Sequence, residues 1–159
     1  MSPTRARSIE DLQRALIQVV RRSSVPRAHD RIATRAAVEV DRVEAVALSR
    51  IVDNGSMGLT ELAAQLGVAC STAGRHAAHL EQRALCTRTV DPVDSRAVVV
   101  TPTDLGRSLV ASLRATYREV LGEILEQWSD GDLAHLSDLL GRFGEDLSAL
   151  SEPAAVATP

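Results

Sequence analysis

Lysine is absent from this chain of 159 residues, so all 18 positively charged side chains are arginine. Aromatic residues are nearly absent as well, because Tyr117, Trp128 and Phe143 are the whole set. A protein that binds single strands by stacking bases on aromatic rings is therefore not expected. The net charge of −3 also argues against a nonspecific nucleic-acid coat, but it is compatible with a specific reader that carries a local basic face.

Long apolar runs are missing too. No run of 18 or more apolar residues occurs, which excludes a membrane-spanning helix, and the start MSPTRARS lacks the apolar stretch of a signal peptide. These absences predict a cytoplasmic protein with no membrane partner, in which Cys70 and Cys86 are thiols. No phosphate-binding loop, dinucleotide fingerprint, nucleophile elbow or zinc-protease motif is present, so neither an enzyme nor a cofactor is expected.

Charge is unevenly spread along the chain. Residues 1–50 carry ten Arg and six acidic residues, whereas residues 103–159 carry four Arg and ten acidic residues. The length fits a single chain unit, 1–159. We expect frayed ends over the first nine residues and a flexible tail over 151–159, which are small, polar and proline-bearing.

The first third has a helical pattern. One helix face is indicated by apolar residues at steps of three and four, and it is interrupted at Ser23-Ser24-Val25-Pro26. A second short helix is expected over 27–37. Asp41 followed by Glu44 resembles a capping box that opens a further helix, ending near Asn54-Gly55. The residues of the first face are Ile9, Leu12, Leu16, Val19 and Val20.

The middle of the chain predicts a helix-turn-helix. Thr60 can cap a short helix that ends at Gly67, and a second helix is expected from about Cys70 to Arg83 after a three-residue turn. The inward residues expected for the first helix are Leu62, Ala63 and Leu66, and those for the second are Ala73, Ala77, Leu80 and Ala84.

A β-hairpin is expected directly after these helices. Residues 86–90 and 97–101 are rich in strand-forming side chains, and the turn-forming hexapeptide 91–96 separates them. A hairpin in this position is a wing. The winged lobe is assigned to residues 41–102.

Two helices are expected beyond the wing. The first starts at Pro102 or Thr103 and continues to about Trp128, and Ser129-Asp130-Gly131-Asp132 then caps the second. The second helix has a heptad seam that needs a partner surface. The seam residues are Leu133, Leu136, Leu140, Phe143, Leu147 and Leu150.

The outer face of the helix that starts at Cys70 fits the major groove of DNA. If Ala73 and Ala77 are buried, the other residues of the first turns face outward, and an arginine there can reach guanine or phosphate. Arg96, at the hairpin tip beside Asp94, suits the minor groove, unless the two residues only form a surface pair. Arg88 suits a phosphate. The predicted DNA-binding residues are Ser71, Thr72, Arg75, His76, His79, Arg88 and Arg96.

Other readings of these residues are weaker. Cys70 could be a redox sensor, because a helix dipole lowers a thiol pKa, but a small residue filling a tight turn is favoured. His76 and His79 lie three residues apart, yet they have no acidic or thiol partner nearby in the sequence, so no metal site is predicted.

The predicted helix-turn-helix and wing resemble those of the MarR family of winged-helix transcriptional regulators. The matching blocks are LTELAAQLGV (59–68), STAGRHAAHLEQRAL (71–85) and DPVDSRAVVVTPTDLG (91–106). The resemblance implies a mainly α fold, a winged helix-turn-helix with a short β-hairpin wing, flanked by N- and C-terminal dimerisation helices at 8–37 and 103–150. It also implies a homodimer on a palindromic double-stranded DNA operator, usually a repressor that a small ligand or oxidant releases.

Three positions depart from the family pattern. Ala84 stands where Gly is usual after the recognition helix, and it costs about 1 kcal/mol if that site needs a positive φ. The wing reads Asp-Ser-Arg rather than Asp-Arg-Arg, and Gly74 replaces a hydroxyl residue. The predicted effector pocket lies between the dimerisation helices and the winged lobe. Its candidate residues are His29, Arg31, Arg35 and Tyr117.

An alternative function is a winged-helix protein-interaction module that does not bind DNA. Residues 68–102 carry four Arg and three acidic residues, which is not a strong basic patch. An architectural chromosomal protein is disfavoured because basic tails are lacking. Operator sequence, effector, target genes and the choice between repressor and activator are not encoded in any recognisable pattern.

Overall fold

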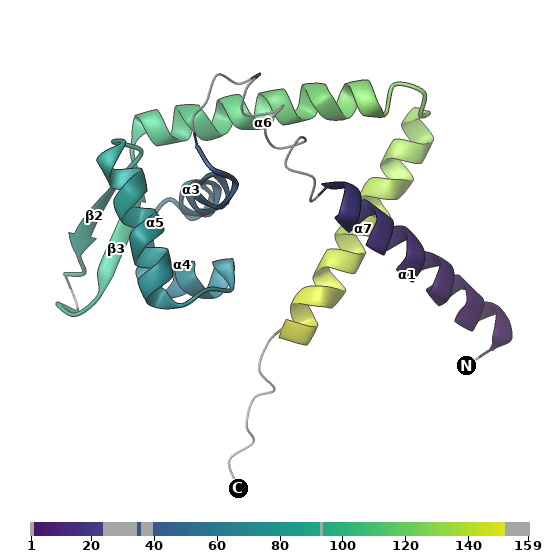
Figure 1. The fold of residues 1–159 in the computed structure, drawn as a ribbon, viewed down its shortest axis with the longest axis horizontal. Helices are drawn as coiled ribbons and strands as arrows, with labels where there is room; N and C mark the ends of the chain where they lie inside the picture. The colour runs from purple at the N-terminus through teal and green to yellow at the C-terminus, as the bar shows by residue number, and fades with distance from the viewer. Residues whose placement is uncertain (1, 24–34, 36–39, 93, 152–159) are drawn as a thin grey trace, which may run out of the picture. The chain divides into compact units, whose positions relative to one another are not determined.

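The computed structural model describes residues 2–23, 35, 40–92 and 94–151. Its first unit covers the chain up to Val120, and its second unit starts at Leu121. The elements are labelled in Figure 1. The helices are α1 (Pro3–Ser23), α3 (Arg42–Asn54), α4 (Leu59–Leu66), α5 (Cys70–Gln82), α6 (Asp104–Ile124) and α7 (Asp130–Ser151), and the strands are β1 (Met57–Gly58), β2 (Cys86–Val90) and β3 (Val98–Pro102).

Helix α1 extends further toward the N-terminus than expected. It begins at Pro3, so most of the segment predicted to be frayed is helical. Its end at Ser23 agrees with the predicted interruption. The short helix predicted over 27–37 lies outside the described residues except for Arg35, and so does the predicted tail after residue 151.

Helix α3 has the predicted ends. The Asp41 carboxylate accepts a hydrogen bond from the backbone N–H of Glu44 at 2.9 Å, which satisfies one of the donors left unpaired at a helix start. Gly55 follows the helix with φ +76°, a conformation that side chains disfavour. Both cap residues were predicted from the sequence.

The helix-turn-helix consists of α4 and α5. The prediction that Thr60 caps α4 is wrong. The helix begins one residue earlier, at Leu59, and Gly58 is the N-cap. The reason is that Met57 and Gly58 are fixed by strand pairing, so helical geometry can start directly after them. Gly67 ends α4 in the left-handed region, as expected.

The core of the winged lobe lies where α3, α4 and α5 meet the sheet (Figure 1). The inner face of α5 contributes Ala73, Ala77 and Leu80, all with no exposed area. Ala84, the fourth residue predicted for this stripe, is exposed, because α5 ends at Gln82 and the chain leaves the helical path. The largest fully buried side chains are Leu48, Ile51, Leu62, Leu80, Val100, Val110 and Cys86.

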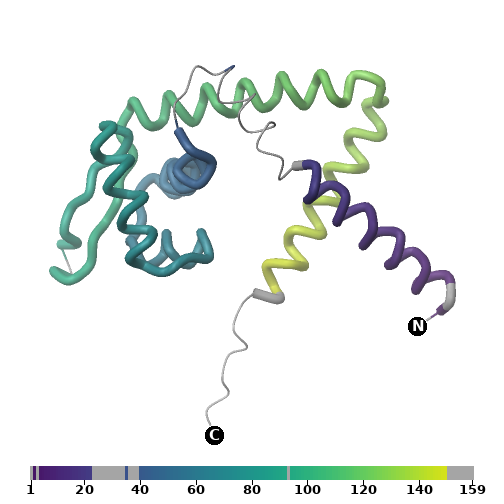
Figure 2. The backbone as a smooth tube through the Cα atoms, in the orientation of Figure 1, coloured from purple at the N-terminus to yellow at the C-terminus, as the bar shows by residue number. Residues whose placement is uncertain are grey.

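The wing is an antiparallel hairpin of β2 and β3, which projects beside α5 in the backbone trace (Figure 2). Its register pairs Cys86 with Pro102 and Val90 with Val98. The sheet has a third strand that the sequence did not reveal, since Met57 pairs with Val100 and Gly58 with Val99. A two-residue strand is too short to show an alternating pattern. The strand order is β1-β3-β2.

The start of α6 is bonded to the turn after α5. The Thr103 hydroxyl donates to the carbonyl oxygen of Ala84 at 2.7 Å and accepts from the backbone N–H of Gly106 at 3.0 Å. The backbone N–H of Thr103 donates to Leu85 at 3.1 Å. The helix ends at Ile124, four residues before the predicted end at Trp128, and turns occupy the residues between.

The second unit contains α7. Its cap is the predicted one, because the Ser129 hydroxyl oxygen accepts from the backbone N–H of Asp132 at 3.2 Å. No described helix is both long and apolar enough to cross a membrane. Among the described residues of the predicted seam, Leu133 is half-buried, and the exposed ones are Leu136, Leu140, Phe143 and Leu147.

Candidate nucleic-acid interface

Helix α5 presents the predicted polar side chains on its outer face. Ser71, Arg75 and His79 are exposed, whereas Thr72 and His76 are half-buried. The guanidinium of Arg75 donates from Nη2 to the Thr72 hydroxyl at 3.3 Å, which links two neighbouring turns of the helix. Burial of Ala73 and Ala77 on the opposite face produces this orientation.

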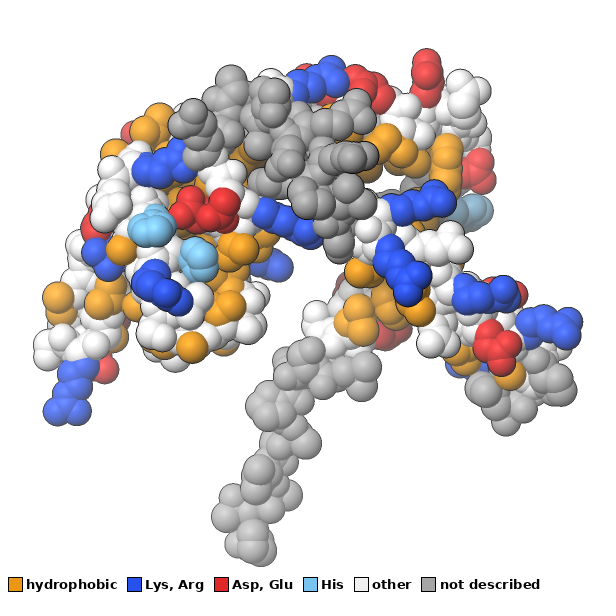
Figure 3. Space-filling model, in the orientation of Figure 1, with side chains coloured by type: hydrophobic (Ala, Val, Ile, Leu, Met, Phe, Trp, Pro, Cys, Tyr) orange, Lys and Arg blue, Asp and Glu red, His pale blue; other side chains and the backbone are white. Residues whose placement is uncertain are grey.

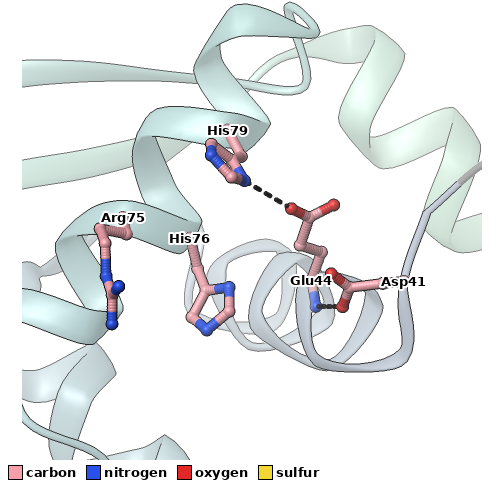
Figure 4. Close-up of a pocket in the computed structure, with 5 residues that line it drawn as sticks. All are labelled: Asp41, Glu44, Arg75, His76 and His79. Atoms are coloured by element: carbon pink, nitrogen blue, oxygen red, sulfur yellow. Dashed lines mark hydrogen bonds and ion pairs between the residues drawn. The ribbon is translucent and has the colours of Figure 1, made fainter.

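Three of these side chains share a pocket with the start of α3. The pocket has a volume of about 260 Å³ and is lined by Asp41 and Glu44 from the start of α3 and by Arg75, His76 and His79 from α5. Figure 4 shows His79 and Glu44 pointing toward each other across the gap between the two helices. In the space-filling view, histidine, acidic and arginine side chains gather on this face of the winged lobe (Figure 3).

Glu44 is the residue of this site that the sequence analysis missed. Its side chain is 9% exposed, and Oε1 lies 3.2 Å from Nδ1 of His79 while Oε2 lies 3.7 Å from Nη1 of Arg83. Local spacing in the sequence indicates only a capping-box role for Glu44. Its partners follow 35 and 39 residues later, so no local pattern could reveal the cluster.

Arg88 already has a protein partner. Its Nη2 lies 2.7 Å from Oε2 of Glu81, and its backbone N–H donates to Oε1 of the same carboxylate at 2.9 Å. The Arg88 guanidinium accordingly holds the pKa of Glu81 below the ordinary value of 4.5. A phosphate contact by Arg88 stays a prediction, and it would require Arg88 to exchange or share this carboxylate.

The wing tip presents Arg96. The Asp94 carboxylate accepts a hydrogen bond from the backbone N–H of Arg96 at 3.0 Å, and the Asp94 N–H donates to the carboxylate of Asp91 at 3.3 Å. Among the ion pairs found in the described ranges, none involves Arg96 and Asp94. Asp94 therefore shapes the turn through the backbone, which leaves the exposed Arg96 side chain available at the tip.

The structure tests the predicted effector pocket only in part. His29 and Arg31 lie outside the described residues. Arg35 forms an ion pair with Glu119 of α6 at 3.6 Å, and Tyr117 on the same helix is 53% exposed. The pocket itself stays a prediction.

The two cysteines are free thiols, as predicted, and they occupy different environments. Cys70 is exposed at the start of α5, whereas Cys86 is buried at the start of β2. Burial raises the pKa of Cys86 to about 11, and the nearby Glu81 carboxylate adds to the effect. Within residues 2–23, 35, 40–92 and 94–151, no group of three or more His, Cys, Asp or Glu side chains could hold a metal ion.

The arrangement of α3, α4 and α5, with an antiparallel hairpin after α5 and a polar outer face on α5, defines a winged helix-turn-helix protein. Residues 40–98 match the model of the MarR family, which confirms the resemblance seen in the sequence over the winged lobe.

Known proteins support this assignment. A curated relative, the uncharacterized HTH-type transcriptional regulator YxaD of Bacillus subtilis (strain 168), is 29% identical over 106 residues, which cover 67% of this chain and 74% of YxaD. The crystal structure of RV1404 from Mycobacterium tuberculosis is 27% identical with a TM-score of 0.71, covering 93% of this chain and 97% of that one. A MarR family protein from Bacillus stearothermophilus shares the fold at 19% identity with a TM-score of 0.77, covering 90% and 97%.

Proposed function

We propose that this protein is a sequence-specific transcriptional regulator that binds double-stranded DNA as a homodimer. The observation that carries the proposal is the outer face of α5, where Ser71, Arg75 and His79 are exposed on a helix whose opposite face is buried in the core. A helix with short polar groups and an arginine on its outer turns can read base edges in the major groove.

Arg96 supplies the second contact. It lies in the turn of the hairpin that follows α5, and its backbone is fixed by Asp94. A cation on a narrow projecting turn can enter the minor groove, where the negative potential is enhanced. Base reading by α5 and minor-groove insertion by the wing would together fix the position of each winged lobe along the DNA.

The exposed apolar side chains of α7 favour a second copy of this chain as partner. Leu140 is 53% exposed and Phe143 is 36% exposed, and both belong to the predicted seam. A helix that keeps such a seam in water needs a partner surface. A two-fold dimer would present two α5 helices to successive major grooves, roughly 34–36 Å apart, which calls for a palindromic operator.

Such a dimer acts in the cytoplasm as a repressor by occupying its operator. A small effector that changes the spacing of the two lobes would weaken binding, because the DNA repeat fixes the half-site spacing. Arg35 and Tyr117 are the described residues that the effector pocket would use.

Fluorescence anisotropy tests the proposal with a duplex selected by the protein from a randomised pool. Arg75→Ala and Arg96→Ala should each weaken binding. Each should also reduce by about one the salt slope, which is the slope of the logarithm of the association constant against the logarithm of the salt concentration. Arg142→Ala, in α7 and outside the winged lobe, is the matched control and should bind like the natural protein. Unchanged binding by both interface variants would remove the proposed reading surface.

One observation favours a second candidate, a protein-interaction module without DNA binding. Two of the four arginines in residues 68–102, Arg83 and Arg88, lie in ion pairs with Glu44 and Glu81, which weakens the basic character of the face. If the selection yields no duplex that binds even at 20 mM salt, this second candidate becomes the better account.

A further inference from the structure

The most unusual group near the proposed interface is the Glu44 carboxylate. It belongs to α3, not to α5, yet it lies against the His79 imidazole of α5 and the guanidinium of Arg83, the residue that follows that helix. The Glu44 side chain is 9% exposed, whereas those of its partners His79 and Arg83 are 63% and 38% exposed. A buried carboxylate therefore lies beneath an exposed imidazole and a partly exposed guanidinium.

The two contacts restrain the side chains of both His79 and Arg83. Glu44 Oε1 is at hydrogen-bond distance from Nδ1 of His79, 3.2 Å, and Oε2 attracts the Arg83 guanidinium at 3.7 Å. Because the hydrogen bond occupies Nδ1, only Nε2 of His79 points outward. An arginine without a protein partner is attracted to the phosphates of DNA whatever the base sequence. The charge of an arginine that is paired with a carboxylate is already neutralised.

We propose that Glu44 is a specificity-determining residue of the DNA interface, which restrains His79 and Arg83 so that they do not add sequence-independent attraction for the phosphate backbone. The inference rests on the proposed DNA-binding function. Glu44 touches no DNA itself and acts through its two partners. The outer residues Ser71, Thr72 and Arg75 would then dominate the choice of sequence.

The variant Glu44→Gln keeps the shape and the hydrogen-bonding ability of the side chain but removes its charge. We expect its affinity for a scrambled duplex to rise by about 3- to 10-fold at 50 mM salt, and its salt slope to steepen by about one, because the Arg83 guanidinium becomes free to meet a phosphate. Affinity for the selected duplex should rise less, so the ratio of the two affinities should fall.

Two further variants separate this role from a structural one. Glu61→Gln on α4 changes the charge of the lobe equally, but Glu61 is exposed and bonded to Gln65, so its effect should be much smaller. In the double variant Glu44→Gln/Arg83→Gln, the salt slope should return toward the natural value. Equal salt slopes for Glu44→Gln and Glu61→Gln would overturn the inference, as would an unchanged ratio of affinities.

If Glu44→Gln does not fold, single variants at exposed positions test the same idea. Arg83→Gln should change the salt slope by less than about half a unit because Glu44 already neutralises Arg83, whereas Arg75→Gln should change it by about one. A full unit lost in Arg83→Gln would contradict the inference. Absence of binding by the natural protein would overturn the proposed function and the inference with it, whereas normal binding with an unaltered ratio would overturn the inference alone.

Discussion

Glu81 of α5 binds both the side chain and the backbone of Arg88 in β2. Oε2 of Glu81 accepts from Nε of Arg88 at 2.8 Å, and Oε1 accepts from the Arg88 backbone N–H at 2.9 Å. The carboxylate thereby joins the last turn of α5 to the first strand of the wing. The two surfaces proposed to contact DNA are held together by one side chain.

Replacement of this side chain should loosen the wing. In Glu81→Ala the amide of Arg88 loses its acceptor, so we expect it to exchange hydrogen faster, as measured by amide exchange followed by NMR. Gln82→Ala, at the neighbouring exposed position, is the control and should leave the exchange of Arg88 unchanged. Equal exchange in Glu81→Ala and the natural protein would show that the carboxylate does not hold the strand.

The same contact should depend on pH. Because Arg88 lowers the pKa of Glu81 from 4.5, the contact stabilises the folded state fully above about pH 4.5. The contribution is lost as the pH falls through the lowered pKa of the folded state. Protection of the Arg88 amide in the natural protein should therefore persist at pH 4.5 and fall at lower pH, while Glu81→Ala should show no such step.

Gly106 is required by a close approach of two backbones. A Cβ at this position would overlap the carbonyl oxygen of Leu85 and lie 3.3 Å from Cδ1 of Leu48. We expect Gly106→Ala to lower the free energy of unfolding by about 3 kcal/mol in urea denaturation, at the upper end for overpacking, because backbone cannot move aside easily. Gly74→Ala, whose Cβ would meet only Leu59 at 3.5 Å, should instead raise it by about 0.5–1 kcal/mol.

Ala84 is a strained residue in the turn after α5. Its φ is +57°, and it is the one described residue other than glycine with a positive φ. Ala84→Gly should raise the free energy of unfolding by about 0.5–1 kcal/mol, because glycine adopts this conformation without the clash of a Cβ. Ala78→Gly, within α5, should lower it by a similar amount. A loss of stability in Ala84→Gly would contradict the strain.

The two thiols should react at very different rates. Cys86 is buried with a pKa of about 11, so about one molecule in a thousand carries its thiolate at pH 8, whereas Cys70 is exposed. A thiol reagent such as Ellman's reagent should modify one thiol per folded chain rapidly. Cys70→Ser should remove this fast phase, and unfolding in guanidinium should expose the second thiol. Rapid modification of Cys86 in the folded protein would contradict its burial.

The seam of α7 should determine the oligomeric state. Leu140→Glu would place a charge against the partner in both copies, and we expect the dimer dissociation constant to rise by about 100- to 1000-fold in analytical ultracentrifugation. Ala134→Glu, which lies outside the seam on the same helix, is the control and should leave the dimer intact. A natural protein that sediments as a monomer would reject the proposed dimer.

Local sequence signals predicted the lobe well. Asp41 and Gly55 mark the ends of α3, Gly67 ends α4, and the alanine stripe of α5 is buried, because caps and helical spacing act over a few residues. The hairpin was likewise visible from its strand-forming residues and turn. The mistaken positions lie at element ends, where Thr60 is displaced by a strand pair and Ala84 falls beyond the last turn of its helix.

Contacts between distant segments could not be predicted. The short strand Met57–Gly58 is defined by its partners in β3, more than 40 residues later, rather than by its own composition. The ion pairs of Glu44 and Arg88 likewise form with side chains that only the fold brings near. The residue types indicated a charged surface. Which of its arginines are paired within the protein, and which can contact a partner, depends on tertiary contacts that the sequence does not show.

The packing of α5 leaves its outer face free to vary in sequence. Its inner face consists of two alanines and one leucine packed in the core, and its outer side chains contribute little to that packing. Substitutions at Ser71, Thr72 or Arg75 can therefore accumulate with little loss of folding stability. If α5 reads DNA as proposed, a lineage can acquire a new operator sequence through substitutions on one helix face, while the scaffold that presents the helix stays the same.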